Sequence, residues 1–540
     1  MSAYSTIRAA DAIARRLYAA GCRHAFGMPG GEVLTIVDAL EAAGITFVLC
    51  KHENAAGFMA EAAWHHTGAP GIMVATIGPG ILNGVNSIAN AHQDRVPLIV
   101  LSGCVDAGEA QTYTHQVLDQ QAVLQPITKA SFRLSADAAH VIADKAVGIA
   151  MEGRPGPVHI DVPISVADAK VPAEAPAPRA LPTPTAPTGN GLATARDWLA
   201  TAQRPVMVVG VDAMNQQAGP ALTEFAQRFG IPVITTYKAK GLIPENHALA
   251  LGAAGLSPLA DSHLVPFVEQ SDLVICVGYD PIEMRPGWRD IWDARTKHVI
   301  DITAEPNHHY MHQASLSFIA DCAASLYAIG DGIAARDTWT SGEIAALKNA
   351  LAQAFPTDDT WGPAAVIDTC RTVLPENTIA TADSGAHRIL LSQMWTCTEP
   401  RGMLQSSALC TMGCALPLAM GTALCKPDRP VVSFSGDAGF LMIAGELATA
   451  QEMGIKPIFV VFVDASLALI ELKQRQRQMR NAAVDFGMHD YAAMGSAFGG
   501  AGHTVHSRAE LEVALAAAQS ADTFSVIACV IERGAYDGRI

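Results

Sequence analysis

The sequence predicts an α/β protein made of three doubly wound domains with mainly parallel sheets. Its 540 residues are about three times the usual length of one domain. Short apolar runs recur along the chain. Each is followed by turn residues and then by helical periodicity, which is the pattern of β-α-β units. Hydrophobic residues make up 50% of the chain and charged residues 16%, so it can bury large cores.

Changes in composition along the chain predict the domain boundaries. The first domain is expected over residues 1–168, with the apolar run Leu98–Leu101 as one of its buried strands. Residues 169–190 are dense in Ala and Pro, which predicts an extended linker. A second domain is expected over 191–335 and a third over 355–540.

Buried parallel strands are predicted in both later domains, because their apolar runs end at turn residues. Periodicity of this kind indicates an architecture but names no reaction. The runs in the second domain are Val206–Val209, Val233–Thr236, Leu273–Val277 and Val299–Ile302. Those in the third domain are Val431–Phe434, Ile458–Val463 and Val526–Ile531.

Charge, hydropathy and cysteine use exclude several classes of function. The chain has 36 Lys and Arg against 52 Asp and Glu, a net charge of −16, which argues against nucleic acid or an anionic membrane as the main partner. It contains no apolar run of about 18 residues, and Arg15 and Arg16 stand where a secretory leader would be apolar. The eleven cysteines form no C-x-x-C pair, so we expect reduced thiols in a cytoplasmic protein.

A strand, a tight turn and the start of a helix are predicted across Val431–Phe440. The glycines there let the backbone approach a phosphate, and a helix N-terminus favours negative charge. Asp437 stands at the end of this strand, and Asp464 ends the next one 27 positions later. Ligands of parallel sheets bind at the carboxyl ends of strands, so the two aspartates are placed to share a divalent cation. A helix cap and a turn residue are the alternative.

These motifs and others resemble those of thiamine diphosphate (ThDP) enzymes, in the branch of acetolactate synthases, pyruvate oxidases and 2-oxo acid decarboxylases. G-D-A-G-F at Gly436–Phe440 and E-L-A-T-A at Glu446–Ala450 resemble the diphosphate motif. K-H-E-N-A-A at Lys51–Ala56 resembles the element that carries the activating glutamate. The resemblance extends over almost the whole chain and favours acetolactate synthase-like large subunits. It makes the first domain pyrimidine-binding and the third diphosphate-binding.

The resemblance implies ThDP and Mg²⁺ as cofactors. Asp437 and Asp464 would bind Mg²⁺ through their side chains and Ser466 through its carbonyl oxygen. Glu53 would hydrogen-bond the aminopyrimidine ring, since a partly buried carboxyl group can hold or release a proton near neutral pH. Met412 would support the bent cofactor. The other implied cofactor contacts are Pro29, Gly30, Gly78, Asn83, His387, Gly436, Ala438, Gly439, Leu467 and Ile470.

The chain departs from the family's motif at two places. Ala438 stands where the family has glycine, and Asp464-Ala465 replaces Asn-Asn. Aspartate is a competent oxygen ligand, so we keep the metal site and expect the extra negative charge to change metal affinity. Taken singly, Glu53 is also consistent with a capping or surface residue and Met412 with an ordinary core residue. Because of the two departures at Ala438 and Asp464-Ala465, a non-catalytic relative with the same fold stays an alternative, although the retained Glu53, Asp437 and Met412 argue against it.

The reaction is less closely specified than the cofactor. His115 and Gln116 resemble a loop of the synthases and are candidates for handling the substrate carbonyl and a proton, with an ordinary polar loop as the alternative. The decarboxylases' catalytic glutamate is here Ile470, and a tryptophan of the synthases is Lys473. We hypothesise that Lys473 faces an anionic substrate group, although a solvated helix lysine fits equally. Carboligation is favoured; a decarboxylase, lyase or hydrolase of an unusual anionic 2-oxo acid is the alternative.

The resemblance also implies an assembly. The two domains that share a cofactor belong to different subunits in this family, so we expect a homodimer or homotetramer with active sites between subunits. The expected partner is a small-molecule substrate, with neither nucleic acid nor membrane. The domain over 191–335 resembles one that holds FAD in some members. Gly278–Pro281 replaces an acidic, arginine-containing segment of those members, so FAD is not favoured.

Overall fold

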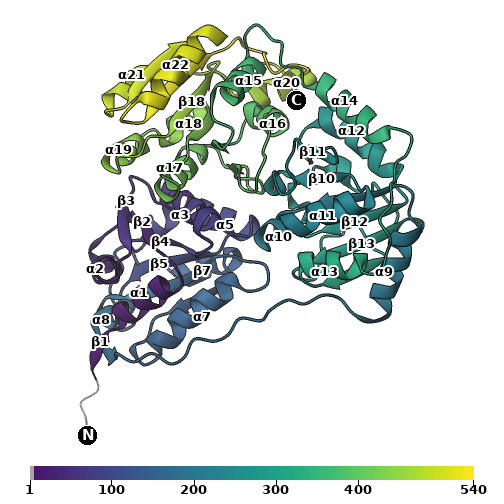
Figure 1. Ribbon diagram of the computed structural model, residues 1–540. Helices are drawn as coiled ribbons and strands as arrows, with labels where there is room; N and C mark the ends of the chain where they lie inside the picture. Colours follow the sequence, from purple (N-terminus) through teal and green to yellow (C-terminus); the bar gives the residue numbers. More distant parts are fainter. Residues whose placement is uncertain (1–4) are drawn as a thin grey trace.

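The computed structural model describes residues 5–540; residues 1–4, the start of the first predicted domain, lie outside the described part. Three parallel six-stranded sheets with flanking helices form three domains (Figure 1), as the predicted α/β class requires. Renumbered within each domain, the first and last sheets share the strand order 2-1-3-4-6-5, and the middle sheet has the order 3-2-1-4-5-6. Within residues 5–540, no helix has the length and apolar character needed to span a membrane.

The first domain has the sheet order β3-β2-β4-β5-β7-β6. One of its elements differs from prediction: β8 (Lys170–Pro172) lies in the expected linker but pairs antiparallel with β1 (Thr6–Arg8). The strands of the sheet are β2 His24–Met28, β3 Thr46–Leu49, β4 Gly71–Ala75, β5 Leu98–Cys104, β6 Ala130–Arg133 and β7 Val158–Pro163. The helices are α1 Ala9–Ala19, α2 Leu34–Ala42, α3 Glu53–Thr67, α4 Pro79–Asn83, α5 Val85–Gln93, α6 Gln120–Leu124, α7 Ala139–Met151 and α8 Ile164–Asp168.

The middle domain has the order β11-β10-β9-β12-β13-β14. Each apolar run predicted there as a strand is one. The strands are β9 Pro205–Val209, β10 Val233–Thr236, β11 Ala250–Ala254, β12 Leu273–Val277, β13 His298–Thr303 and β14 Leu316–Ile319. The helices are α9 Gly189–Thr201, α10 Val211–Asn215, α11 Gly219–Phe229, α12 Pro258–Glu269 and α13 Cys322–Gly330, with α14 Glu343–Ala354 packed on α12.

The last domain has the order β16-β15-β17-β18-β20-β19, so the two strands that end at the predicted metal ligands are central neighbours. Its strands are β15 Ile379–Ala382, β16 Met403–Gln405, β17 Val431–Gly436, β18 Ile458–Val463, β19 Ala501–Val505 and β20 Ser525–Val530. Its helices are α15 Pro363–Val373, α16 Ala386–Met394, α17 Ala415–Cys425, α18 Asp437–Ile443, α19 Glu446–Glu452, α20 Ala468–Gln476, α21 Tyr491–Ala497 and α22 Arg508–Ser520.

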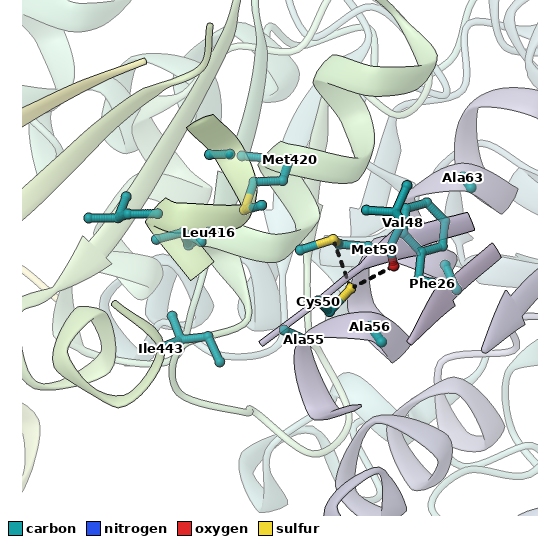
Figure 2. Packing of buried hydrophobic residues seen from close by; sticks show 14 of the residues in the cluster. Phe26, Val48, Cys50, Ala55, Ala56, Met59, Ala63, Leu416, Met420 and Ile443 are labelled. Carbon is teal, nitrogen blue, oxygen red and sulfur yellow. Dashed lines mark hydrogen bonds between the residues drawn. The ribbon is translucent and has the colours of Figure 1, made fainter. Parts of the chain in front are cut away.

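The first and last domains share one hydrophobic core (Figure 2). Met59 of α3 and Met420 of α17 belong to the same buried cluster. The two helices approach so closely that a Cβ at Gly421 would lie 2.6 Å from the Met59 carbonyl oxygen. Burying a side chain of this size contributes about 1.5–3 kcal/mol. This contact fixes α3, the helix that starts at Glu53, against the last domain.

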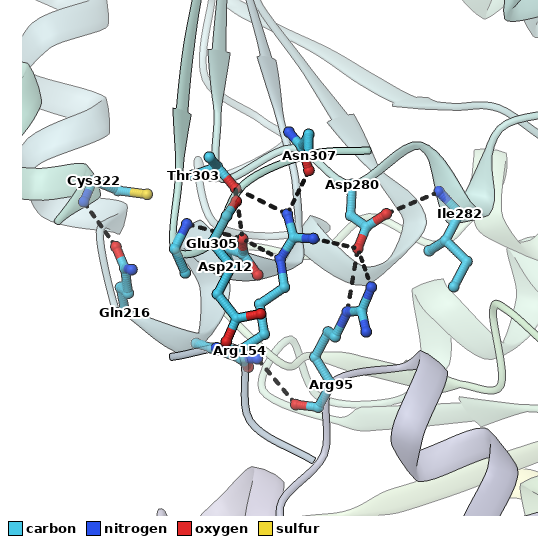
Figure 3. A network of polar contacts seen from close by, with 12 residues as sticks. Arg95, Arg154, Asp212, Gln216, Asp280, Ile282, Thr303, Glu305, Asn307 and Cys322 are labelled. Carbon is cyan, nitrogen blue, oxygen red and sulfur yellow. Dashed lines mark hydrogen bonds and ion pairs between the residues drawn. The ribbon is translucent and has the colours of Figure 1, made fainter. Parts of the chain in front are cut away.

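Ion pairs join the first domain to the middle one (Figure 3). The Arg154 guanidinium contacts the Asp212 carboxylate at 3.0 Å, and Arg95 contacts Asp280 at 2.8 Å. Arg154 also donates to the Thr303 hydroxyl at 2.9 Å. Asp280 belongs to Gly278–Pro281, the segment whose sequence disfavours FAD. In the structure this segment holds the first and middle domains together through its ion pair with Arg95.

Candidate active site

A pocket of about 590 Å³ lies at the carboxyl ends of β15, β17 and β18 in the last domain. In this strand order, that edge is where the direction of winding reverses and where ligands of α/β sheets bind. Ten of the residues predicted to contact the cofactor or the metal line it: His387, Met412, Gly436, Asp437, Ala438, Gly439, Asp464, Ser466, Leu467 and Ile470.

Two buried carboxylates lie side by side in this pocket. Asp437 Oδ2 accepts hydrogen bonds from the backbone N–H groups of Asp464 at 3.1 Å and Ala465 at 2.7 Å. Burial raises the pKa of Asp437, and burial together with the Asp437 charge raises the pKa of Asp464 to about 7. Within residues 5–540, neither carboxylate forms an ion pair with Lys, Arg or His. A divalent cation would offset this concentration of negative charge.

The oxygen atoms of this pocket fit a hard cation whose coordination shell is completed by phosphate oxygens of a bound molecule. In the part of the chain that the structure describes, no group of three or more His, Cys, Asp and Glu side chains could hold a metal. A cation beside Asp437 and Asp464 would therefore need backbone and phosphate oxygens as well. The Ser466 hydroxyl donates to Glu471 at 2.6 Å, and the Ser466 backbone carbonyl would be a further oxygen donor, since Ser466 lines the pocket. All of these donors are oxygens, the ligands that Mg²⁺ prefers.

Neighbouring positions of the turn differ in their need for glycine. Gly436 is the N-cap of α18 and Asp437 its first residue, so Ala438 is helical and its methyl group meets no conformational penalty. A Cβ at Gly439, in contrast, would lie 1.9 Å from Asp383 Oδ2. The departure at Ala438 therefore preserves the turn, whereas Gly439 is required by close packing.

Asp383 is a residue that the sequence reasoning missed. Its carboxylate is fully buried; Oδ1 lies 2.9 Å from His387 Nε2, and Oδ2 accepts from the Gly413 N–H at 2.6 Å. Its Oδ1 also accepts a hydrogen bond from the Gly436 N–H at 3.4 Å. One carboxylate thus positions three segments of the pocket, including the one next to Met412. Asp383 directly follows strand β15, just as Asp437 directly follows β17. The strand-end rule that predicted Asp437 could therefore also have found Asp383.

The first domain brings together a second group of predicted residues. Glu53 opens α3 with 4% of its surface exposed, and its Oε2 accepts from Asn83 Nδ2 at 3.0 Å. Gly78 has φ +68°, and a Cβ there would lie 2.7 Å from the Gln116 carbonyl oxygen. Gly30 is closed in by Thr76, and Pro29 is exposed. This group lies at the carboxyl ends of β2 and β4, the switch point of that sheet.

A buried network that the sequence did not reveal supports this group. Gln120 Oε1 accepts from the Gly78 N–H at 2.9 Å, and its Nε2 donates to Asp161 Oδ1 at 2.6 Å. Ser102 Oγ also donates to Asp161, at 2.7 Å, and lies 2.7 Å from His159 Nε2. Burial opposes ionisation of Asp161, but its hydrogen bond with His159 and the other donors lower its pKa overall. Gln120 therefore fixes the Gly78 turn to the domain interior.

The predicted substrate-handling residues lie at the surface. His115 and Gln116 are exposed, with Gln116 at φ +59° over the Gly78 turn. Lys473 is exposed on α20. Leu467 and Ile470, next to and on that helix, line the pocket, but Lys473 does not. The structure thus brings Gln116 to the first-domain group and leaves Lys473 outside the pocket.

Comparison with known proteins agrees with this geometry. Three family profiles match the chain: thiamine pyrophosphate enzyme, N-terminal TPP binding domain, over residues 7–123; its central domain over 192–329; and its C-terminal TPP binding domain over 383–529. The chain belongs to the thiamine pyrophosphate enzymes. Thiamine pyrophosphate is another name for ThDP, and the two TPP-binding profiles cover the two groups of residues described above.

Relatives match over nearly their whole length. The acetolactate synthase of Bacillus subtilis (strain 168) is 30% identical over 93% of this chain and 90% of that protein. The catabolic acetolactate synthase of Raoultella terrigena is 28% identical, covering 97% and 95%. The acetolactate synthase large subunit of Parasynechococcus marenigrum (strain WH8102) is 33% identical, covering 99% and 89%. This ThDP enzyme is therefore acetolactate synthase-like.

Proposed function

We propose that this enzyme uses ThDP and Mg²⁺ to join a fragment of a 2-oxo acid to a second carbonyl compound. The similarity to acetolactate synthases across all three domains carries the proposal. When bound, ThDP supplies an electron sink for the electron pair that the carbonyl carbon of the 2-oxo acid keeps as its bond to the carboxylate breaks. Asp437, Asp464 and the Ser466 carbonyl would hold Mg²⁺, and Gly436 and Gly439 would let the backbone approach the diphosphate.

Glu53 would hold and move the proton at the aminopyrimidine ring, for which its buried carboxyl group and Asn83 contact are suited. Met412 would support the bound cofactor, since it lines the pocket. His115 and Gln116 would contact the substrate carbonyl. Lys473 stays the candidate for an anionic substrate group. A higher KM for acidic substrates in Lys473→Met, with unchanged KM in Arg477→Met, would support that role.

We also propose that two copies complete each site, in a homodimer or homotetramer. The described residues that line the last-domain pocket all belong to that domain, so Glu53 would come from the other copy. Exposed apolar side chains occur near both groups: Leu49 is 47% exposed at the end of β3, Leu82 is 45% exposed on α4, and Met442 is 66% exposed on α18. Burying such side chains favours association.

The cytoplasm is the location we propose, and the free cysteines support it. All eleven are unpaired, and nine are buried, as expected for thiols in a reducing compartment.

Product analysis distinguishes joining from simple cleavage. A panel of 2-oxo acids is incubated with enzyme, ThDP and Mg²⁺, with and without a carbonyl acceptor, and CO₂ and organic products are measured. We expect CO₂ release together with a joined product. Aldehyde as the sole product would instead establish the decarboxylase alternative. Turnover of no acid, despite cofactor binding, would contradict both.

A further inference from the structure

A second pocket lies where the three domains meet, separate from the cofactor pocket. It has a volume of about 990 Å³ and is lined by the end of α3 (Trp64–Gly68), by residues of the α10–α11 segment (Met214–Pro220), by Leu242 and by Pro400–Arg401. None of the described residues that line it is Asp or Glu, although the whole chain carries a net charge of −16. The pocket is thus locally suited to an anion.

Arg401 supplies the positive charge of this pocket. Its Nη2 donates to Asn215 Oδ1 at 3.1 Å, and its Nη1 contacts His65 Nδ1. Within residues 5–540, no carboxylate forms an ion pair with the guanidinium; the buried Glu61 carboxylate, which acts to raise the pKa of Arg401, contacts His65 Nε2 at 3.3 Å and also pairs with Lys238. Two of the five Arg401 N–H groups are engaged by the neutral Asn215 and His65, and burial lowers the pKa of Arg401 to about 10. Arg401 also has φ +61°, a conformation kept only where the surroundings hold it.

The neighbouring histidines add no charge to the pocket. Burial lowers the pKa of His65 well below its usual value and that of His66 to about 3, so both are neutral. The Trp64 indole N–H is buried without a hydrogen-bond partner among the described residues, and Trp64 lines both this pocket and the neighbouring one that contains Glu152 and Asp212. Met214 and Leu242 provide apolar wall. A buried donor left without a partner costs about 1–3 kcal/mol, which a bound acceptor would recover.

We propose that this pocket binds a small aliphatic carboxylate, with its charged group against Arg401 and its hydrocarbon part against the apolar wall. A planar guanidinium matches a carboxylate through paired hydrogen bonds. Other pockets of the chain suit such a ligand less, because carboxylates line them: Asp301 in the middle domain, and Glu152 and Asp212 between the first and middle domains.

Helix α3 links this pocket to the catalytic group of the first domain. The helix begins at Glu53 and ends at Thr67, so Trp64 and His65 follow Glu53 by about 18 Å at 1.5 Å per residue. Helix α3 is already packed on α17, so a ligand that contacts the end of α3 and residues of the middle and last domains would act on how the three domains sit around the helix that carries Glu53. The carboxylate therefore acts as an effector rather than as a substrate.

Thermal unfolding of the ThDP- and Mg²⁺-loaded enzyme tests the binding. Isobutyrate is titrated at constant ionic strength, with isobutyramide as its uncharged isostere. We expect a saturable rise of Tm with isobutyrate and no such rise with isobutyramide. Arg401→Gln should weaken the binding about tenfold or more, equal to ~1.4 kcal/mol. Arg295→Gln is the matched control, since the Arg295 side chain is 88% exposed, and it should bind like the wild type.

A second variant serves if Arg401→Gln does not fold. Thr67 is exposed at the rim, so Thr67→Glu should fold normally and repel the ligand. Equal stabilisation of the wild type and both variants by isobutyrate, or a rise with isobutyramide as large as with isobutyrate, would overturn the proposed site. A saturating isobutyrate concentration should change kcat/KM in the wild type but not in Arg401→Gln. Unchanged kinetics in the wild type would overturn the effector role.

Discussion

The two groups of predicted cofactor residues lie at equivalent edges of two sheets with the same strand order, yet they differ in form. In the last domain they line a defined pocket, with Asp437 and Asp464 buried inside it. In the first domain, Glu53 is buried, but Pro29, Asn83 and Gln116 are exposed. The last domain therefore has the form of a binding site for a cation together with the anionic group that the cation would hold, and the first that of a surface which closes over such a site.

This difference predicts that mutations in the two groups have different consequences. Changes in the last-domain pocket should remove cofactor binding, whereas changes in the first-domain group should remove turnover and leave most of the binding.

The largest effect is expected at Asp437. Asp437→Ala removes a carboxylate that would bind Mg²⁺ and also leaves the N–H groups of Asp464 and Ala465 without their acceptor. Activity should fall about 100-fold or more, and ThDP with Mg²⁺ should no longer raise Tm. Asp522→Ala, at a fully exposed aspartate, is the control. Normal stabilisation of Asp437→Ala by the cofactors would contradict the pocket assignment.

Glu53→Gln should separate turnover from binding. It keeps the size of the side chain but removes the carboxyl group that would handle a proton, so kcat should fall about 100-fold. The rise of Tm with ThDP and Mg²⁺ should stay close to that of the wild type. Loss of both in parallel would show that the two groups do not differ in the way described.

Gly439→Ala and Ala438→Gly form a matched pair on neighbouring residues. The first places a methyl group against Asp383 Oδ2 and should destabilise the protein by about 1–3 kcal/mol. The second restores the family's glycine in a helical turn and should cost about 1 kcal/mol or less. Chemical denaturation measures both. A larger loss for Ala438→Gly would refute the account of this turn.

The effect of Asp464→Asn on stability should depend on pH. The pKa of Asp464 is raised in the folded state from 3.8 to about 7, so its contribution to stability is present at low pH and is lost as pH rises through 7. At pH 8 the metal-free variant should be more stable than the wild type by about 1–3 kcal/mol, with no difference near pH 4. The measurement is chemical denaturation of both proteins between pH 4 and 8 without metal. If the free energy of unfolding changes with pH in the same way in both, the repulsion between Asp464 and Asp437 is excluded.

The sequence predicted the architecture and much of the site, because both follow local rules. Apolar runs ending in turn residues located β17 and β18, and the strand-end rule placed Asp437 and Asp464 together. Contacts between distant residues were not predictable in this way. Gln120 bonds the turn at Gly78, 42 positions away, and no local pattern distinguishes it from neighbouring glutamines.

Two further differences have local causes. Strand β8 was hidden in the linker because it has only three residues, and pairing with β1 rather than its own pattern makes it a strand. Lys473 was placed near the substrate by its position in the motif, but the turn of α20 directs Ile470 into the pocket and leaves Lys473 exposed. Its role depends on the assembled enzyme.

Subunit complementation tests the central claim, that each site combines the first-domain group of one copy with the last-domain pocket of another. Glu53→Gln and Asp437→Ala chains with different tags are co-expressed, and the mixed dimers are purified through both tags. Such a dimer has one site with both residues intact, so it should regain about half of the wild-type activity. Mixed dimers of Asp437→Ala and Asp464→Ala, altered in the same pocket, should stay inactive. Activity of the first pair no higher than that of its parents would contradict the claim.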